Sequence, residues 1–185
     1  VNPLAPDSSA PDPLTVALPK AIFATYYLGV VADRYEQVYE HFFEGNNTRR
    51  SDPLQIVLSP PPDFQVTSIT APPLAQSGII ARISYTVTNL GAGSPFGGGW
   101  VDRIYLARQS VFTPDSATLL RKEAFYRQMH PDSSYSVTRD IRLPEGIAGT
   151  YYLYVHTDAD SSVFEFNADN NNVGRSDPII FSISP

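Results

Sequence analysis

Residues 151–185 decide the fold, and they read YYLYVHTDADSSVFEFNADNNNVGRSDPIIFSISP. Residues 26–60 read YYLGVVADRYEQVYEHFFEGNNTRRSDPLQIVLSP and align with them at a constant offset of 125 residues, without a gap. The register extends back to Pro6, opposite Pro131, and about two in five of the paired positions are identical. A self-match of this length indicates a repeated structural unit.

The repeat divides the chain into two predicted modules. Residues 1–60 are expected to be the C-terminal part of a first module, and residues 61–185 a complete second module. Between them, SPPPD at 59–63 predicts a stiff spacer, because consecutive prolines favour an extended polyproline conformation. We therefore expect neighbouring modules to follow one another nearly end to end.

The composition narrows the classes of partner. The chain has 185 residues, of which 42% are hydrophobic and 17% charged, and its formal net charge is −6. An acidic chain without a basic patch is not expected to bind nucleic acid. The chain has no cysteine, which excludes disulfides and thiolate zinc sites. No apolar run approaches the roughly 20 residues that a membrane span requires, so we expect no membrane insertion.

Seventeen prolines and eleven glycines are typical of many short strands joined by tight turns. Residues 79–89 alternate cleanly, with Ile83, Tyr85 and Val87 on one face, which predicts a half-buried antiparallel strand. Trp100 opens another expected strand and should lie in the core. The remaining strands expected in the second module are 64–70, 100–107, 117–126 and 134–143, followed by those of the repeated stretch.

The first module should hold the strands of the repeated stretch alone. A strand is expected from Asp7 onward, weakened by Pro11 and Pro13, since proline removes ladder donors. The pattern then predicts strands at 14–18, 25–33, 35–40 and 54–59. The whole pattern predicts an all-β fold, a two-sheet antiparallel sandwich.

A succession of short motifs resembles the CARDB domain, the cell-adhesion-related domain found in bacteria. The motifs are VTSITAPPLAQSG (66–78), ISYTVTNLG (83–91), WVDRIYLA (100–107), SYSVT (134–138), LPEGIAGTYYLYVHTD (143–158), VFEFNADNNN (163–172) and SDPI (176–179). The resemblance covers all of 63–185 and the C-terminal part of a second copy at 6–60. It implies an immunoglobulin-like β-sandwich, used as a tandem module in large surface or secreted proteins, and it implies no catalytic residue.

The chain departs from the family at one place. After the strand that ends in YL, the family often carries a short acidic loop, whereas this chain has Ala107, Arg108 and Gln109. A cation site that the family builds in that loop is therefore not expected here.

The acidic and amide-rich hairpin at 158–172 is the candidate ligand site. It holds Asp158, Asp160, Glu165 and Asp169, and asparagines at 170–172 add amide oxygens. Calcium takes six to eight oxygen ligands, so such a cluster indicates a calcium site, although the spacing is not that of an EF-hand. In the alternative interpretation, Asp and Asn fill turns that need side-chain bonds to the backbone and tolerate positive φ. The sequence leaves both interpretations open.

Other candidate sites have simpler explanations. Asp158 and Glu165 could act as the acid and base of a glycosidase, but the hairpin that carries them occurs twice, so a structural repeat explains them better. The histidines, His41, His130 and His156, share no motif, and none recurs at the repeat offset. Each tyrosine pair of the repeat, 26–27 and 151–152, should expose one ring, which could stack on sugars or line a sheet.

The sequence therefore predicts a non-enzymatic repeat module of a large extracellular surface protein, fibre or filament. Such a module gives reach and mediates contacts with the cell surface or with other subunits. Its expected partners are other modules or subunits of the same protein, and surface glycans or another cell. The second hypothesis is a carbohydrate-binding accessory module of a secreted hydrolase.

Overall fold

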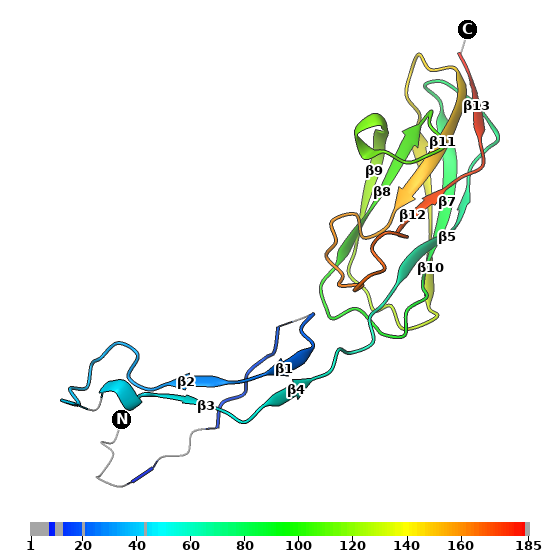
Figure 1. The fold of residues 1–185 in the computed structure, drawn as a ribbon. Helices are drawn as coiled ribbons and strands as arrows, with labels where there is room; N and C mark the ends of the chain where they lie inside the picture. The colour runs from blue at the N-terminus through cyan, green and yellow to red at the C-terminus, as the bar shows by residue number, and fades with distance from the viewer. Residues whose placement is uncertain (1–7, 10–12, 20, 43, 184–185) are drawn as a thin grey trace. The chain divides into compact units, whose positions relative to one another are not determined.

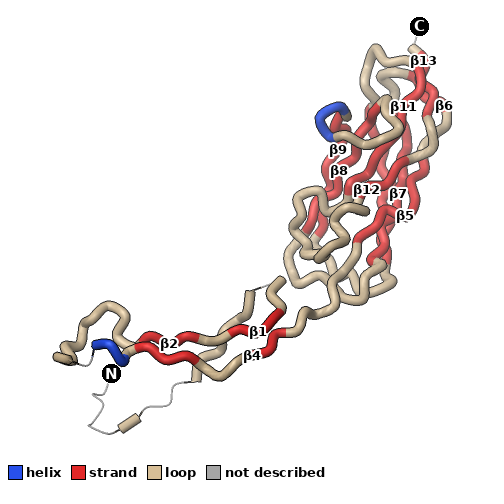
Figure 2. Tube along the Cα trace, viewed as in Figure 1, coloured by secondary structure: helices blue, strands red, loops and turns tan. Residues whose placement is uncertain are grey.

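The computed structural model describes residues 8–9, 13–19, 21–42 and 44–183, and it divides the chain into two units, residues 1–57 and 58–185 (Figure 1). The regular structure is almost entirely strand, which confirms the all-β class (Figure 2). The exceptions are two single turns of 3-10 helix, Glu44–Asn46 and Pro114–Ser116. Within the described ranges, no helix has the length and apolar character that a bilayer crossing requires.

One sheet of the second unit has three antiparallel strands. Its order is β10 (Ser134–Arg142), β7 (Ile80–Asn89) and β5 (Phe64–Thr70). The alternation of β7 buries Ile83, Tyr85 and Val87, as the sequence predicts, because successive side chains of a strand point to opposite faces.

The second sheet runs in the order β6, β13, β11, β8 and β9. Strand β11 pairs with β13 through its first residues and with β12 through its last, while β8 takes its other edge. The two sheets confirm the predicted sandwich. All of its strand pairs are antiparallel except β6 with β13, and the sequence did not predict this parallel pair. The bounds are β6 (Leu74–Gln76), β8 (Trp100–Ala107), β9 (Thr118–Phe125), β11 (Gly149–His156), β12 (Val173–Arg175) and β13 (Ile179–Ser182).

Trp100 lies in the core between the two sheets, as predicted from the sequence. Its ring contacts Phe64 with centroids 4.9 Å apart and stacks on Phe125 at 5.8 Å. Its indole N–H donates to the hydroxyl of Tyr135 at 3.0 Å, so the one polar atom of the side chain is satisfied. Aromatic residues from both sheets thus form one end of the core.

The final strand of the second unit is broken at Ser176. Pro178 has no backbone N–H to donate, and the ladder with β11 stops between β12 and β13. The Ser176 hydroxyl replaces the missing backbone partner, because it accepts the N–H of Leu153 at 3.0 Å and donates to the carbonyl of Asp177 at 2.6 Å. The break is therefore a built feature with its hydrogen bonds satisfied.

The first unit contains the same hairpin. Strand β1 (Ala24–Tyr26) pairs with β4 (Leu54–Ile56), and β2 (Gly29–Val31) pairs with β3 (Thr48–Arg50). At the repeat offset these pairs match β11 with β13 and β11 with β12, residue for residue in register. The Ser51 hydroxyl accepts the N–H of Leu28 at 3.0 Å, as Ser176 does in the second unit. The sequence repeat thus corresponds to a repeated backbone pairing.

The strand predicted at 35–40 is wrong. Asp33 and Glu36 have positive φ, and the Asp33 carboxylate accepts the N–H groups of Gln37 and Val38, both at 2.8 Å. Hydrogen bonds from the backbone to the side chain of Asp33 form a local turn here in place of a strand.

Three other predicted strands of the first unit differ from the structure. The strand expected at 25–33 is divided into β1 and β2, and that at 54–59 contains only β4. Residues 14–18 form no strand, because the described part of this unit holds no counterpart of β7, with which β10 pairs in the second unit. The strand expected from Asp7 onward lies partly outside the described residues, and the division into two modules joined end to end stays a prediction.

Residues 61–185 are expected to unfold in one cooperative transition, because both sheets and the core lie within this segment. Trp100→Ala should lower the free energy of unfolding by about 3–5 kcal/mol through the cavity and the lost transfer energy of the indole. Urea unfolding followed by circular dichroism measures both effects. As a control, Tyr126→Ala should change the stability by less than about 0.5 kcal/mol, because the ring is 85% exposed. Equal effects of the two substitutions would contradict this core.

Candidate metal centre

The loop at 157–172 joins β11 to β12 and carries the acidic residues. Its ends meet because His156 and Val173 are register partners, and the N–H of Thr157 donates to the carbonyl of Asn172 at 3.0 Å. Val163 anchors the loop, since its side chain is buried in the core of the sandwich. A long loop is thereby held at three points.

Asp158 organises the first half of this loop. Its φ is 44°, in the left-handed region that Asp tolerates. One carboxylate oxygen accepts the N–H of Ser162 at 2.9 Å, and the other accepts the N–H of Val163 at 3.0 Å. These are the side-chain bonds to the backbone that the turn interpretation requires. Asp158 is also buried, with 1% of the residue exposed.

Glu165 connects the second half of the loop to the beginning of the domain. One oxygen accepts the backbone N–H of Phe64, the first residue of β5, and the other accepts the side-chain amide of Asn172. The side chain is also 1% exposed. Because Phe64 belongs to the three-stranded sheet, this carboxylate attaches the loop to the opposite layer of the sandwich.

Three of the four predicted ligands converge. Asp158, Glu165 and Asp169 each place one carboxylate oxygen within 4.8 Å of the others. Asp160 does not join them, since its carboxylate forms an ion pair with Arg103 of β8. The structure therefore groups two buried carboxylates with an exposed one and places Asp160 outside the group.

Burial opposes the charge of the two inner carboxyl groups. Desolvation raises the pKa of Asp158 to about 6 and the pKa of Glu165 to about 7, and the nearby charge of Asp169 adds to both. Hydrogen bonds from Val163, Ser162, Asn172 and Phe64 act in the opposite direction without cancelling the shift. A cation bound among the three groups would favour their ionised forms.

The cluster fits a calcium ion in its donor set. Ligand oxygens that lie 2.3–2.6 Å from one calcium ion are at most about 5 Å apart, which the three carboxylates satisfy. The Oδ1 atom of Asn172 is buried and has no hydrogen-bond partner in the described structure, so it adds an acceptor next to Glu165. Binding of calcium by Asp158, Glu165 and Asp169, with or without Asp160, stays a prediction.

The same turn occurs in the first unit at Asp33, the counterpart of Asp158. Its φ is 39°, and its carboxylate bonds the N–H groups four and five residues further on, as in the second unit. Asp33 is only partly buried and its neighbours are exposed, so the turn forms without the near-complete burial of Asp158. The local sequence thus determines the turn, and the surrounding sheets add the burial that shifts the pKa of Asp158.

The other candidate residues do not assemble into a site. Asp158 and Glu165 lie close together, but with 1% of each exposed they offer no surface on which a glycoside could bind. His156 packs its ring edge-on against Phe112, and burial lowers its pKa. His130 bonds Ser94 through Nδ1 at 3.2 Å, and His41 packs against Phe42 in the first unit.

A buried carboxylate that the sequence analysis did not single out connects the two sheets. Asp102 in β8 is fully buried and accepts hydrogen bonds from the hydroxyls of Tyr85 at 2.8 Å, Tyr135 at 2.7 Å and Thr157 at 2.8 Å. Burial raises the pKa of Asp102. The sequence could have indicated this burial. Trp100, Asp102 and Ile104 occupy alternate positions of one strand and therefore share a face, and Trp100 is expected in the core.

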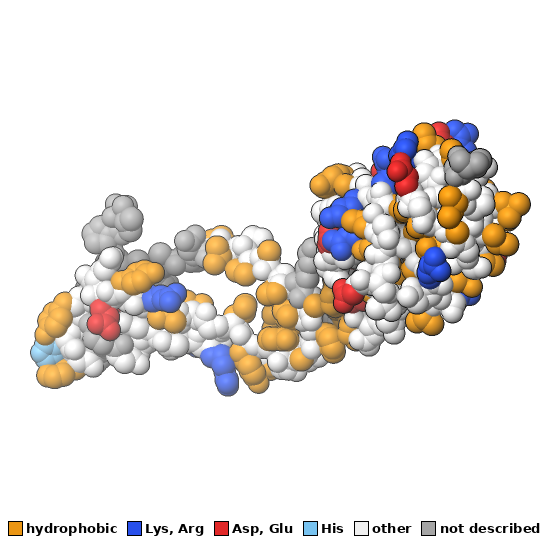
Figure 3. All heavy atoms as spheres, turned by 90° about the horizontal axis from the view of Figure 1, so that it is seen from above, with side chains coloured by type: hydrophobic (Ala, Val, Ile, Leu, Met, Phe, Trp, Pro, Cys, Tyr) orange, Lys and Arg blue, Asp and Glu red, His pale blue; other side chains and the backbone are white. Residues whose placement is uncertain are grey.

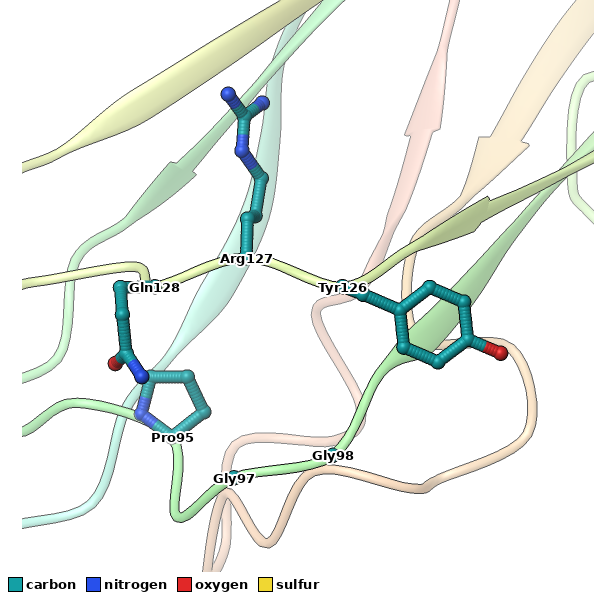
Figure 4. A pocket seen from close by; sticks show the side chains of 6 residues that line it. All are labelled: Pro95, Gly97, Gly98, Tyr126, Arg127 and Gln128. Carbon is teal, nitrogen blue, oxygen red and sulfur yellow. The ribbon is translucent and has the colours of Figure 1, made fainter.

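A hollow in the surface of the second unit lies next to the exposed aromatic ring of Tyr126. The hollow has a volume of about 330 Å³ and is lined by Pro95, Gly97, Gly98, Tyr126, Arg127 and Gln128. Figure 4 shows that the side chains of Tyr126, Arg127 and Gln128 point in three different directions. Polar groups that bind a small ligand normally converge on it, and these do not.

The second tyrosine of each predicted pair packs against an arginine. Arg175 lies 5.2 Å from the ring centroid of Tyr152, and Arg50 lies 4.2 Å from that of Tyr27. One face of the Tyr27 and Tyr152 rings is thus taken up by a cation–π contact.

A family model described as CARDB matches residues 61–175, which confirms the resemblance for this part of the chain. A search among curated proteins finds no match. The crystal structure of the CARDB domain of a Pyrococcus furiosus protein in complex with di-metal ions is 21% identical, with 66% of this chain and 90% of that one covered and a TM-score of 0.49.

Two further solved structures are similar to part of this chain. The solution NMR structure of that Pyrococcus furiosus domain is 22% identical, with 65% of this chain and 94% of that one covered and a TM-score of 0.47. A β-glucosidase from Listeria innocua is 15% identical, with 66% of this chain covered and a TM-score of 0.40. This chain spans only 16% of that enzyme.

Calcium is expected to raise the melting temperature of the chain, because a ligand bound by the native state alone adds to its stability. Asp169→Asn should reduce this gain without lowering the melting temperature in chelator, since Asp169 is the exposed member of the cluster and its charge repels those of Asp158 and Glu165. Asp160→Asn is the matched control and should keep the response, because Asp160 pairs with Arg103. Identical melting curves in calcium and in chelator would leave only the turn interpretation.

In chelator, the stability is expected to fall as the pH rises from about 4 to about 7. Asp158 and Glu165 have folded-state pKa values of about 6 and about 7, above the unfolded values near 4, so the folded state holds protons that the unfolded state releases. The loss should reach about 1.4 kcal/mol per pH unit for each group within its own window.

Glu165→Gln tests the origin of this slope. Its amide can donate to Asn172 Oδ1 after a flip of the Asn172 amide, so the hydrogen bonds are kept and one titrating group is removed. Urea midpoints between pH 4 and pH 8 should depend less on pH in this variant. A slope equal to that of the wild type would mean that Glu165 does not titrate in this range.

Proposed function

We propose a structural role for this chain, which belongs to the CARDB family. It is a non-enzymatic repeat module of an extracellular surface protein, fibre or filament, where it gives reach and contacts other subunits. The observation that carries the proposal is the hairpin built twice in one chain, with the same register pairs and the same serine-bonded break. Repetition of a folding unit along a chain is how proteins build length.

The spacer before the second unit supports a stiff arrangement. Asn89 Oδ1 accepts the N–H of Asp63 at 2.9 Å, and the N–H of Gly93 donates to the carbonyl of Pro61 at 3.0 Å. A Cβ atom on Gly93 would lie 1.7 Å from the carbonyl oxygen of Pro60, so only glycine permits this approach. The prolines are thus bonded to the β7–β8 loop, which fixes one end of the spacer.

The same loop is itself held from two sides. The Asn89 side-chain amide donates to the carbonyls of Gly93 at 2.8 Å and Met129 at 2.9 Å, and Asn89 is fully buried. A buried amide with its donors and its acceptor occupied favours a single conformation. We call this arrangement of Asn89 and Gly93 around residues 60–63 the proline clamp.

The partners and the location follow from the structural role. Other modules or subunits of the same protein are the first expected contacts, and surface glycans or another cell the second. The two sheets within residues 64–182 form a sandwich with its own core, which suits an extracellular module, and calcium would be an added brace of the loop at 157–172.

The alternative function is a carbohydrate-binding accessory module of a secreted hydrolase. It is favoured by one observation, the ring of Tyr126, which is 85% exposed beside the hollow of Figure 4. An exposed aromatic ring can stack on a sugar. The polar side chains around the hollow do not converge on a common point, as those of a sugar-binding site would, and this favours the structural role.

The proline clamp gives the test of the structural role. The chain has no cysteine, so spin labels at Ser59→Cys and Ser110→Cys are unique. The distance between them should show one narrow distribution, because the spacer is bonded to the loop. Gly93→Ala should broaden it, whereas Gly29→Ala, at which a Cβ meets open space, should not.

Two outcomes would contradict the structural role. A broad distribution in the wild type would remove the stiffness on which reach depends. Binding to an insoluble polysaccharide that Tyr126→Ala abolishes would favour the carbohydrate-binding function.

A further inference from the structure

The hairpin of the first unit leaves uncovered the face that is buried in the second unit. Leu28 is 48% exposed and its counterpart Leu153 is 0% exposed; Val30 is 67% exposed and Val155 is 0% exposed. Figure 3 shows hydrophobic side chains along the outside of the first unit. Leu28 and Val30 are two residues apart and so lie on one face of the strand, in the register of Leu153 and Val155, so the exposed face corresponds to the inner face of the hairpin in the second unit.

The hairpin also leaves one strand edge unpaired. In the second unit, residues 152–156 of β11 pair with residues 103–107 of β8, on the edge opposite β12. The counterparts of those β11 residues, at 27–31, pair only with β3 in the described part of the chain. An unpaired edge beside an uncovered apolar face is the surface on which an added strand docks.

The local geometry of this hairpin is already that of the covered form. The N–H of Ala32 donates to the carbonyl of Asn47 at 2.8 Å, as that of Thr157 does to Asn172 at 3.0 Å. The turn at Asp33, the bonds of Ser51 and the contact of Arg50 with Tyr27 all have their counterparts in the second unit. Docking of a second sheet therefore requires no rearrangement of the hairpin.

We propose that residues 24–56 are a preformed acceptor, completed by a pair of sheet segments built like residues 64–142 and carried by the same polypeptide on the N-terminal side of the hairpin. The segment that completes the hairpin would supply two parts. A strand like β8 would pair with the free edge at 27–31, and a three-stranded sheet like β10–β7–β5 would cover the apolar face. The inference deepens the proposed modular function and rests on it.

The order of the second unit argues for a source in the same polypeptide. There, β10 ends at Arg142 and β11 begins at Gly149, so a short connection leads directly from the covering sheet into the hairpin. Leu18 and Pro19 match Leu143 and Pro144 of that connection. A second copy of the chain is a poorer occupant, because its own residues 64–142 are already covered by the hairpin attached to them.

The experiment extends the full chain. Residues 61–144 are placed ahead of Lys20, where they replace residues 1–19, so that the connection of the second unit leads into the first hairpin. Hydrogen exchange is then compared between this chain and the parent. We expect the amides of 27–31 to exchange at least about 100-fold more slowly in the extended chain, as in cooperatively packed strands.

Two substitutions in the extended chain separate docking from nonspecific collapse. Val30→Asp places a charge at the position of the fully buried Val155 and should remove the added protection. Val31→His is the matched control and should keep it, because the second copy has His156 there, half-buried at the outer face. The amides of β7 and β10 in the second unit serve as an internal standard and should stay protected in every chain.

Three outcomes would overturn the proposal. In the first, the amides of 27–31 exchange as fast in the extended chain as in the parent. In the second, Val30→Asp and Val31→His change the protection of these amides equally. In the third, the amides of 27–31 in the parent chain become protected as its concentration rises. The last result would mean that a second copy covers the face. None of these outcomes alters the spacer measurement, which tests the modular function by itself.

Discussion

A sheet with one apolar face has to be covered by another sheet, and this constraint shapes both units. In the second unit the strands β10, β7 and β5 cover the hairpin, and Leu153 and Val155 lose all exposure. In the first unit the same strand pairs form in the same register, yet Leu28 and Val30 stay exposed. Local sequence is therefore sufficient for the hairpin, and the second sheet supplies the burial.

Buried carboxylates hold the two layers of the sandwich together at one end. Asp102 in one sheet accepts hydrogen bonds from the hydroxyls of Tyr85 and Tyr135 in the other, and Glu165 accepts a hydrogen bond from the backbone N–H of Phe64. The hydrogen bonds to these two carboxylates come from hydroxyl, side-chain amide and backbone N–H donors, all of them uncharged groups. Desolvation by burial raises the pKa of each of Asp102, Asp158 and Glu165, and the hydrogen bonds to these groups offset only part of the shift.

Alternation made much of the fold predictable. The strand at 80–89 and the buried Trp100 follow from side chains that point to opposite faces. The strand at 35–40 was predicted wrongly, because the carboxylate of Asp33 bonds the backbone that a partner strand would need. In the candidate site, residue type identified Asp158, Glu165 and Asp169, whereas Asp160 turns to Arg103, a residue far away in sequence whose position only the folded sheet determines.

The shared register of the two hairpins also bears on how the chain folds during synthesis. The hairpin at 24–56 emerges before β8, and the hairpin that belongs to β8 emerges last. A nascent chain thus holds two segments with the geometry to close the same sheet, and misassembly between neighbouring repeats is a characteristic failure of such proteins. The two hairpins differ at inward positions, because Ile179 and Phe181 fill the core of the second unit where the first hairpin has Leu54 and Ile56, so an exchange of hairpins would change the side chains that pack there.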